Sequence, residues 1–203
     1  NLWDLGFDLG HSVRTIEECI NESKKDLTVV TTLMESRVIS GEKKLFLLMK
    51  DSIKPNLMWS SRDFFISKTR EQSQRHLRSS NAANKLEPNI KLNPGGLRDI
   101  QLINWVANRH FQIHGLNELI SHNLLTEGQL RIIYEGQSFL WKIRYGLHSI
   151  AKRREDRLLF DYQKNLAIML GYEDASFMLG VEQMMQRYYR TVMDIRRINE
   201  MIL

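Results

Sequence analysis

The sequence is poor in proline, glycine and cysteine, and it contains no long hydrophobic run. Three prolines and 11 glycines among 203 residues are too few for a fold with many tight turns, so the composition favours long helices. A single cysteine, Cys19, forms no internal disulfide and no thiolate metal cluster, which indicates a reducing compartment such as the cytoplasm. The chain lacks the run of about 18 apolar residues that a membrane-spanning helix needs.

The composition that remains is that of a soluble globular protein. Hydrophobic residues make up 42% of the chain and charged residues 26%, which excludes a disordered tail, a collagen-like repeat and a disulfide scaffold. The chain begins at Asn1 without an initiator methionine. We therefore expect it to be a fragment of a longer protein.

Positive charge is concentrated in one segment. The net charge of +5 comes from 29 basic and 24 acidic residues, a mixed surface that does not resemble a nucleic-acid binding stripe. Between residues 142 and 157 the basic residues clearly outnumber the acidic ones: Lys142, Arg144, Lys152, Arg153, Arg154 and Arg157 against Glu155 and Asp156. This segment is either the solvated end of a helix or a site for a phosphate or an acidic partner protein. Nucleic acid is the least favoured partner, because no exposed aromatic residues are interleaved with the basic ones.

Local capping patterns predict where the helices begin. Thr15 with Glu18 forms a capping box, which predicts a helix from Ile16, and Asp26 is a good N-cap for a helix that Gly41 would end. Apolar spacing predicts further helices in residues 43–58 with an end at Pro55, from Ser60 to about 78, after Gly96, over 127–154, over 162–170, and from about 181 to the end of the chain.

The two ends of the chain differ in character. Residues 6–14 have a pattern that a short strand would give. The last helix has a heptad seam, which predicts a bundle helix packed in the core: Val181, Met185, Tyr188, Val192, Ile195, Asn199 and Ile202. The predicted fold is mainly α, a multi-helix bundle with a small α/β element at its N-terminus.

The segment from Lys91 to Ile100 carries the most informative turn. Gly95 and Gly96 let the backbone come close to another group, with their amides at the N-terminus of the following helix. Lys91 and Arg98 add positive charge, and Asp99 suits the helix dipole and has the charge to hold Arg98 or a cation. Two interpretations remain open: an anion or nucleotide site, or a structural turn with a capped helix.

One charged side chain lies within an apolar stripe. Arg144 falls on the face of its predicted helix that should be buried, and a buried polar group needs a partner. We therefore expect Arg144 to pair with a carboxylate from a neighbouring helix, with Asp99 or Asp161 as candidates.

Several motifs together resemble a known family. They occur in order along the whole chain, and the longest are Gly10-His11-Ser12-Val13-Arg14-Thr15-Ile16-Glu17-Glu18-Cys19, Pro94-Gly95-Gly96-Leu97-Arg98-Asp99-Ile100-Gln101 and Asp156-Arg157-Leu158-Leu159-Phe160-Asp161. They closely resemble the bifunctional PII uridylyltransferase/uridylyl-removing enzymes of bacterial nitrogen control. The related glutamine synthetase adenylyltransferases share the Gly-Gly-x-Arg-Asp-Ile motif, but there an acidic residue is expected where this chain has Gln101.

The resemblance implies a division of the chain. Residues 1–42 would be the C-terminal remnant of a nucleotidyltransferase domain, and residues 43–203 a helical bundle domain. The Asp-x-Asp pair that holds the metal ions, the HD motif and the glutamine-sensing ACT domains would all lie outside this chain. We therefore expect the chain to be inactive alone, because the two metals that clamp the transferring phosphate need the missing pair.

The resemblance also implies an activity and a set of site residues. The intact enzyme would use Mg²⁺ to transfer UMP from UTP to a tyrosine of the PII signalling protein, and would remove it again. Asp8 is the candidate catalytic and metal-binding carboxylate, with Asp26 second. The nucleotide side or its support would include Arg14, Lys91, Gly95, Gly96, Arg98 and Asp99, and PII would bind Arg144, Arg153, Arg154 and Arg157. The alternatives are a fragment of a glutamine synthetase adenylyltransferase and a non-catalytic helical module that binds a protein.

Overall fold

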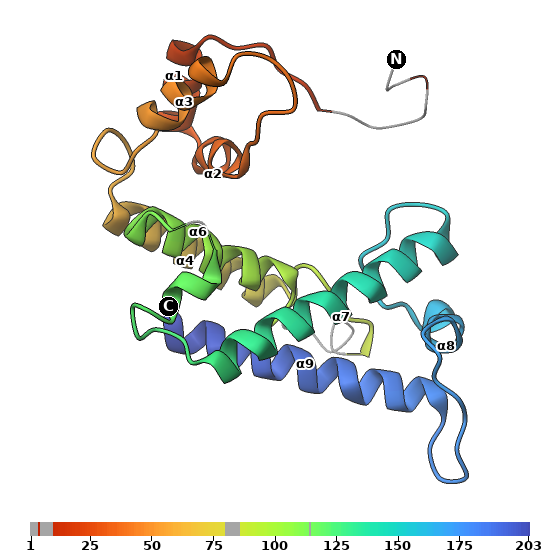
Figure 1. Ribbon diagram of the computed structural model, residues 1–203. Helices are drawn as coiled ribbons and strands as arrows, with labels where there is room; N and C mark the ends of the chain where they lie inside the picture. Colours follow the sequence, from red (N-terminus) through yellow and green to blue (C-terminus); the bar gives the residue numbers. More distant parts are fainter. Residues whose placement is uncertain (1–3, 5–9, 80–85, 114) are drawn as a thin grey trace. The chain divides into compact units, whose positions relative to one another are not determined.

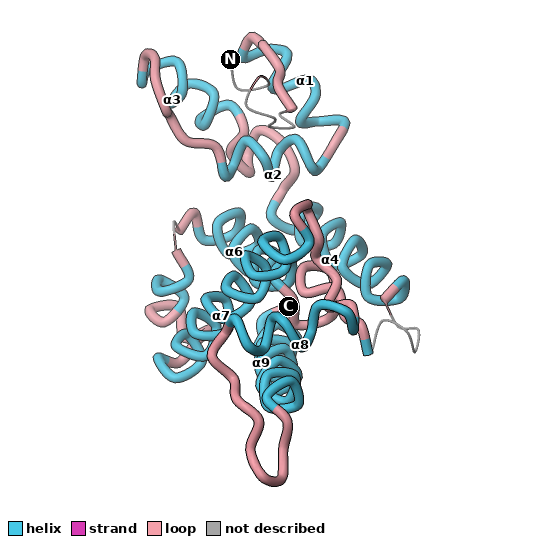
Figure 2. The backbone as a smooth tube through the Cα atoms, turned by 90° about the vertical axis from the view of Figure 1, so that its right-hand side faces the viewer, coloured by secondary structure: helices cyan, strands magenta, loops and turns pink. Residues whose placement is uncertain are grey.

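The computed structural model describes the chain except for residues 1–3, 5–9, 80–85 and 114 (Figure 1). Within the described residues every regular element is a helix, as the cyan segments of Figure 2 show. The chain divides into two compact units, residues 1–64 and residues 65–203. The mainly helical character that the sequence predicted is confirmed.

The smaller unit contains three short helices, α1 (Ile16–Lys25), α2 (Leu27–Glu35) and α3 (Lys43–Ser52), and α1 contacts the other two. The predicted capping box is present: Glu18 N–H donates to the Thr15 hydroxyl at 3.2 Å, and Thr15 N–H donates to the Glu18 carboxylate at 2.7 Å. Asp26 separates α1 from α2, and its carboxylate accepts from Thr28 N–H at 2.6 Å. These bonds satisfy amides that a helix start leaves unpaired.

Helix α2 is shorter than the sequence predicted. It ends at Glu35, not at Gly41. The Lys50 ammonium, from α3, donates to the carbonyls of Leu33 at 2.8 Å and Met34 at 2.6 Å. A long-range side chain therefore satisfies the carbonyls at the end of α2, a contact that local periodicity does not reveal.

The predicted N-terminal strand is not seen. Residues 6–9 of that prediction lie outside the described residues, and residues 10–14 form no strand, with Val13 97% exposed. The nucleotidyltransferase remnant therefore stays a prediction, as does the division of the chain at residue 42.

The larger unit is a bundle built on four helices: α6 (Leu97–Phe111), α7 (Glu127–Ala151), α8 (Phe160–Met169) and α9 (Gly180–Ile202). A 3-10 turn, η1 (Leu116–Leu119), precedes α7, and α4 (Ser61–Arg78) supplies residues from 65 onward. Helices α7, α8 and α9 contact one another, and α6 contacts α7 and α9 (Figure 1). The fully buried core includes Ile103, Ile133, Leu140, Leu147, Leu166 and Ile195.

Helix α9 occupies the core, as its seam predicted. Tyr188, Ile195 and Asn199 are buried. An added Cβ on Gly136 of α7 would lie 2.9 Å from Ile195 Cδ1, so glycine at this position permits the close approach of α7 and α9. No helix within the described part of the chain is long and apolar enough to cross a bilayer.

Candidate functional site

The paired glycines before α6 are required by the packing of the chain itself. Gly95 has a φ of +76°, and an added Cβ would lie 1.9 Å from the carbonyl oxygen of Val192 in α9. A Cβ on Gly96 would lie 2.7 Å from the carbonyl oxygen of Ile90. Glycine is therefore needed at both positions so that the turn can pack against α9 and against the preceding loop.

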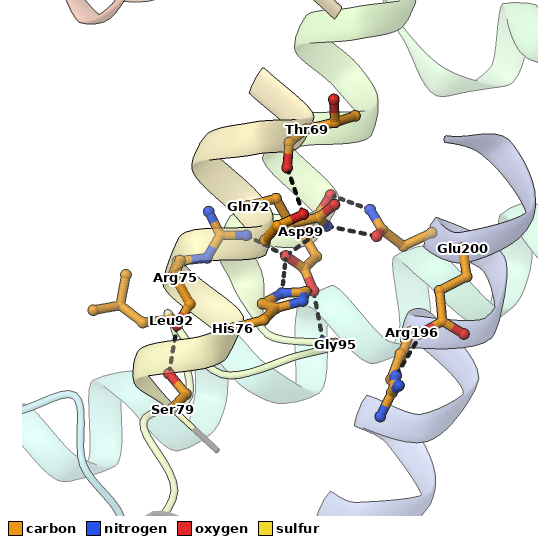
Figure 3. Close-up of polar contacts among 12 residues, drawn as sticks. Thr69, Gln72, Arg75, His76, Ser79, Leu92, Gly95, Asp99, Arg196 and Glu200 are labelled. Carbon is orange, nitrogen blue, oxygen red and sulfur yellow. Dashed lines mark hydrogen bonds and ion pairs between the residues drawn. The ribbon is translucent and has the colours of Figure 1, made fainter. Parts of the chain in front are cut away.

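Asp99, in the first turn of α6, is completely buried and is the centre of a polar network (Figure 3). Gly95 N–H donates to its carboxylate at 2.7 Å, and Gln72 Nε2 donates at 3.1 Å. The Arg75 guanidinium forms an ion pair with it, and His76 Nε2 lies 3.1 Å from each carboxylate oxygen. A buried carboxylate is tolerated when it is paired and hydrogen-bonded in this way.

The Asp99 network joins three helices. Gln72 Nε2 also donates to Asn199 Oδ1 at 2.6 Å, and Asn199 Nδ2 donates to the Asp99 carbonyl at 3.3 Å. The network therefore ties α4 and α9 to the start of α6. The sequence left Arg98 or another cation open as the partner of Asp99, and the structure shows Arg75, with His76 beside it, and not Arg98.

The network also determines the ionisation of Asp99. Burial alone would raise the pKa of this carboxyl, but the hydrogen bonds and positive charge of His76, with the hydrogen bonds from Gln72 and Gly95 N–H, lower the pKa below its ordinary value. Asp99 is therefore ionised at neutral pH. Each of its oxygens is already occupied by donors from the chain, which makes its direct role a structural one.

Arg144 pairs with a carboxylate, but not with either candidate from the sequence. Its Nε lies 2.7 Å from the carboxylate of Asp156, in the loop after α7, and His148 Nε2 lies 3.3 Å from the same oxygen. The prediction of Asp99 or Asp161 is therefore wrong. Helix α7 ends at Ala151, and the chain then turns back to place Asp156 beside α7.

The predicted residues Lys91 and Arg98 lie close to Arg144 and Asp156. Ile90 N–H donates to the Asp156 carbonyl at 2.9 Å, and Arg98 N–H donates to the Lys91 carbonyl at 2.9 Å. Burial lowers the pKa of the Lys91 ammonium, and the positive charges of Arg98, Arg144 and Arg154 lower it further.

We call Lys91, Arg98, Arg144 and Arg154 the basic cluster. Sequence reasoning divided these four residues between a nucleotide site and a partner site. The structure brings them together.

The remaining predicted residues lie elsewhere or are engaged. Arg153 Nη2 pairs with Glu155 at 3.1 Å, and the backbone N–H of Arg157 donates to the other oxygen of Glu155 at 3.0 Å. The Nε atom of the Arg157 side chain is buried and has no hydrogen-bond partner among the described residues. Arg14 is exposed on the smaller unit, and Asp8 lies outside the described residues.

No magnesium site is found among the described residues. No three of their His, Cys, Asp or Glu side chains gather closely enough to hold a metal ion. Asp26, the second candidate carboxylate, caps α2.

Comparison with known proteins identifies the family. The profile of the GlnD PII-uridylyltransferase family matches residues 63–203, more than half of the chain. The chain belongs to the PII-uridylyltransferase family. No solved structure gives a significant match.

The relatives are named bifunctional uridylyltransferase/uridylyl-removing enzymes. The one from Stutzerimonas stutzeri is 47% identical over 201 residues, which are 99% of this chain and 22% of the relative. The one from Nitrosococcus oceani is 48% identical over 202 residues, which are 100% of this chain and 23% of the relative. The one from Pseudomonas aeruginosa is 46% identical over 202 residues, covering 100% of this chain and 22% of the relative. The chain therefore spans about a fifth of the length of these relatives.

The match to the PII-uridylyltransferase family includes both polar groups of the larger unit, the Asp99 network and the basic cluster. Sequence reasoning missed four members of the first: Gln72, Arg75, His76 and Asn199. Two signals pointed to them. Gln72, Arg75 and His76 are spaced to share one helical face, and Asn199 is a polar residue at a seam position.

Proposed function

We propose that the intact protein containing this chain transfers UMP from UTP to a tyrosine of the PII signalling protein and removes it again, in the control of nitrogen assimilation. The observation that carries this proposal is the identity of 46–48% to the bifunctional enzymes over essentially the whole chain. The names of these relatives favour uridylyl transfer over the adenylyl transfer of the related glutamine synthetase enzymes. The proposed location is the cytoplasm.

In this proposal the catalytic groups are divided between this chain and other parts of the protein. The Asp-x-Asp pair, the bound Mg²⁺, the HD motif and the glutamine-sensing domains belong to the parts outside residues 1–203. Asp8 is the proposed third carboxylate of the transfer site. The tyrosine hydroxyl of PII would attack the α-phosphate of UTP and release pyrophosphate, and fixed positive groups would balance the charge on the phosphates.

The larger unit has a supporting role on the nucleotide side. Lys91 and Arg98 supply positive charge, and Gly95, Gly96 and Asp99 hold the turn that carries them against α4 and α9. Arg14 is a further proposed residue of the nucleotide side. A rigid support matters because catalysis depends on holding the reacting groups in a narrow range of geometry.

The activity is tested with the intact protein, PII, UTP and Mg²⁺. Mass spectrometry should show PII gaining one UMP, and Asp8→Asn should abolish the gain. Asp161→Asn, an exposed carboxylate on α8, is the matched control and should leave the transfer unchanged. Incorporation of AMP from ATP in preference to UMP would contradict the proposal, as would full activity of the Asp8→Asn variant.

PII docking is a separate proposal that rests on the basic segment. We propose that PII binds over Arg144, Arg153, Arg154 and Arg157, where Arg154 is exposed. Charge reversal with Arg153→Glu and Arg154→Glu should weaken the capture of PII in a pull-down, because it replaces attraction by repulsion. Lys164→Glu, an exposed charge on α8, is the control. The proposal is refuted if the chain with Arg153→Glu and Arg154→Glu captures as much PII as the unchanged chain and the Lys164→Glu control do.

A further inference from the structure

The four residues of the basic cluster come from separate segments that the fold holds together. Lys91 and Arg98 flank the turn before α6 and are joined by a backbone hydrogen bond of 2.9 Å. Arg154 lies in the loop after α7, and backbone bonds tie that loop to the same turn. Arg144 comes from α7 itself and is anchored by its ion pair with Asp156. The cluster is therefore a product of tertiary structure and not of one charged run.

Positive charge in the cluster is not neutralised by the chain. The Lys91 ammonium lies in the electrostatic field of three other cations, Arg98, Arg144 and Arg154, and of one carboxylate, Asp156. Arg144 and His148 already share that carboxylate, so four cations face one negative charge and the excess is three charges. Among the residues that the structure describes, Lys91, Arg98 and Arg154 have no carboxylate within ion-pair distance. Gathering like charges raises the free energy of the folded chain, and a bound anion would lower it.

The cluster is open to an anion and has the right groups for one. The Arg154 side chain is exposed, the Arg144 side chain is 30% exposed, and Lys91 and Arg98 are half-buried. The Arg98 guanidinium lies over the ring of Trp105, 5.3 Å from its centroid, which orients it without using its hydrogen-bond donors. Partial burial strengthens the attraction for an anion, because water screens the charges less than at a fully exposed site.

We propose that the basic cluster binds the phosphate chain of a nucleoside triphosphate, through the Lys91 ammonium and the guanidinium groups of Arg98, Arg144 and Arg154. The planar guanidinium fork matches two phosphate oxygens at once, and three forks beside one ammonium suit several linked phosphates. A triphosphate group carries several negative charges, so it balances the three excess positive charges of the basic cluster better than a single carboxylate does. Nucleic acid would need a longer basic track with aromatic stacking partners.

This inference rests on the proposed uridylyl transfer for the identity of the nucleoside, and on the cluster for the phosphates. It assigns Arg144 and Arg154 to the phosphates, so it competes with the proposed PII docking for these two side chains. It also separates two roles around the turn before α6. Asp99, Gly95 and Gly96 build the turn, whereas Lys91 and Arg98 contact the ligand.

The test is isothermal titration calorimetry of the 203-residue chain with sodium tripolyphosphate at low salt. Binding should weaken as salt rises, because the interaction is electrostatic. Lys91→Ala and Arg98→Ala should each weaken binding about tenfold or more, the usual effect of losing a hydrogen bond to a charged group. Lys164→Ala, which removes an exposed lysine on α8, should bind as the unchanged chain does.

A variant that is expected to strengthen binding distinguishes a change in the site from a folding defect. Asp156→Asn removes the negative charge of the cluster but keeps an oxygen that can accept from Arg144 Nε, so it should tighten tripolyphosphate binding, whereas a damaged fold would weaken it. Unchanged or weaker binding by a folded Asp156→Asn variant would overturn the proposal. Circular dichroism melting of each variant identifies any that is not folded, and Lys91→Gln then replaces Lys91→Ala as the smaller change. UTP should displace tripolyphosphate from the chain.

The proposal is overturned if tripolyphosphate does not bind, if Lys164→Ala weakens binding as much as Lys91→Ala, or if UTP fails to displace tripolyphosphate. Tighter binding of a polyglutamate peptide than of tripolyphosphate would also overturn it, in favour of an acidic protein partner. If the chain does not bind tripolyphosphate but the intact protein transfers UMP to PII, only the phosphate-binding proposal is refuted. Binding by the chain without any UMP transfer by the intact protein would instead refute the proposed function alone.

Discussion

Replacing Asp99 with Asn should destabilise the larger unit strongly. The substitution keeps the shape of the side chain but removes the charge that faces Arg75 and His76. Removing one partner of a buried ion pair costs about 3–5 kcal/mol, because the other charge is left buried and unpaired. The Arg75 side chain is 13% exposed and recovers some hydration, so we expect a loss of about 3 kcal/mol. For a unit of this size, that corresponds to a melting temperature about 10 °C lower.

The effect of pH on this variant has a definite sign. The pKa of Asp99 is lowered in the folded chain, so its contribution to stability is fully present above the ordinary carboxyl pKa of about 4. That contribution is lost as the pH falls through the lowered pKa. The difference between the unchanged chain and Asp99→Asn should therefore shrink as the pH falls below about 4.

The assay is thermal and urea unfolding of the 203-residue chain followed by circular dichroism, with hydrogen exchange to separate the two units. Amides of α6 and α9 should exchange faster in Asp99→Asn, and amides of α1 should not change. Asp161→Asn, in the exposed first turn of α8, is the control and should lose less than about 1 kcal/mol. A loss below about 1 kcal/mol for Asp99→Asn would refute the reasoning, as would a loss that persists unchanged at pH 3.

Two further predictions concern contacts that local sequence does not reveal. Gly95→Ala should destabilise the larger unit by at least about 2 kcal/mol more than Gly171→Ala in urea unfolding: both have positive φ, but only Gly95 faces the backbone of α9, with open space at Gly171. Equal losses would show that the contact with α9 is unimportant. Lys50→Met should destabilise the smaller unit by about 1–2 kcal/mol, because two carbonyls of α2 lose a charged donor, and amide exchange in α2 should speed up. The exposed Lys44→Met is its control, and slow exchange retained in Lys50→Met would contradict this role.

The sequence alone determined where several helices begin. Thr15 with Glu18, and Asp26, each make their capping hydrogen bonds within three residues along the chain. Such bonds depend only on local geometry, so they can be read from spacing. The seam of α9 was equally readable, because an apolar repeat that must be buried is a property of one helix.

The ends of helices and the partners of charged groups were decided by tertiary structure. Helix α2 ends where Lys50 reaches it, Arg144 pairs with Asp156 across a loop, and Gly95 is required by the backbone of α9. Each depends on a segment distant in sequence or on the path of a connecting loop, and neither periodicity nor propensity encodes that path.

The chemistry of the site shows the same division. The sequence identified Lys91, Arg98 and Asp99 as charged residues around a turn, but it treated them as one group. Packing separates them: Asp99 is fully buried and bonded to α4, whereas Lys91 and Arg98 remain accessible beside Arg144. Residue type determined which charges are present. The fold decided which of them are neutralised within the chain and which are not, because burial and pairing are set by neighbours far along the chain.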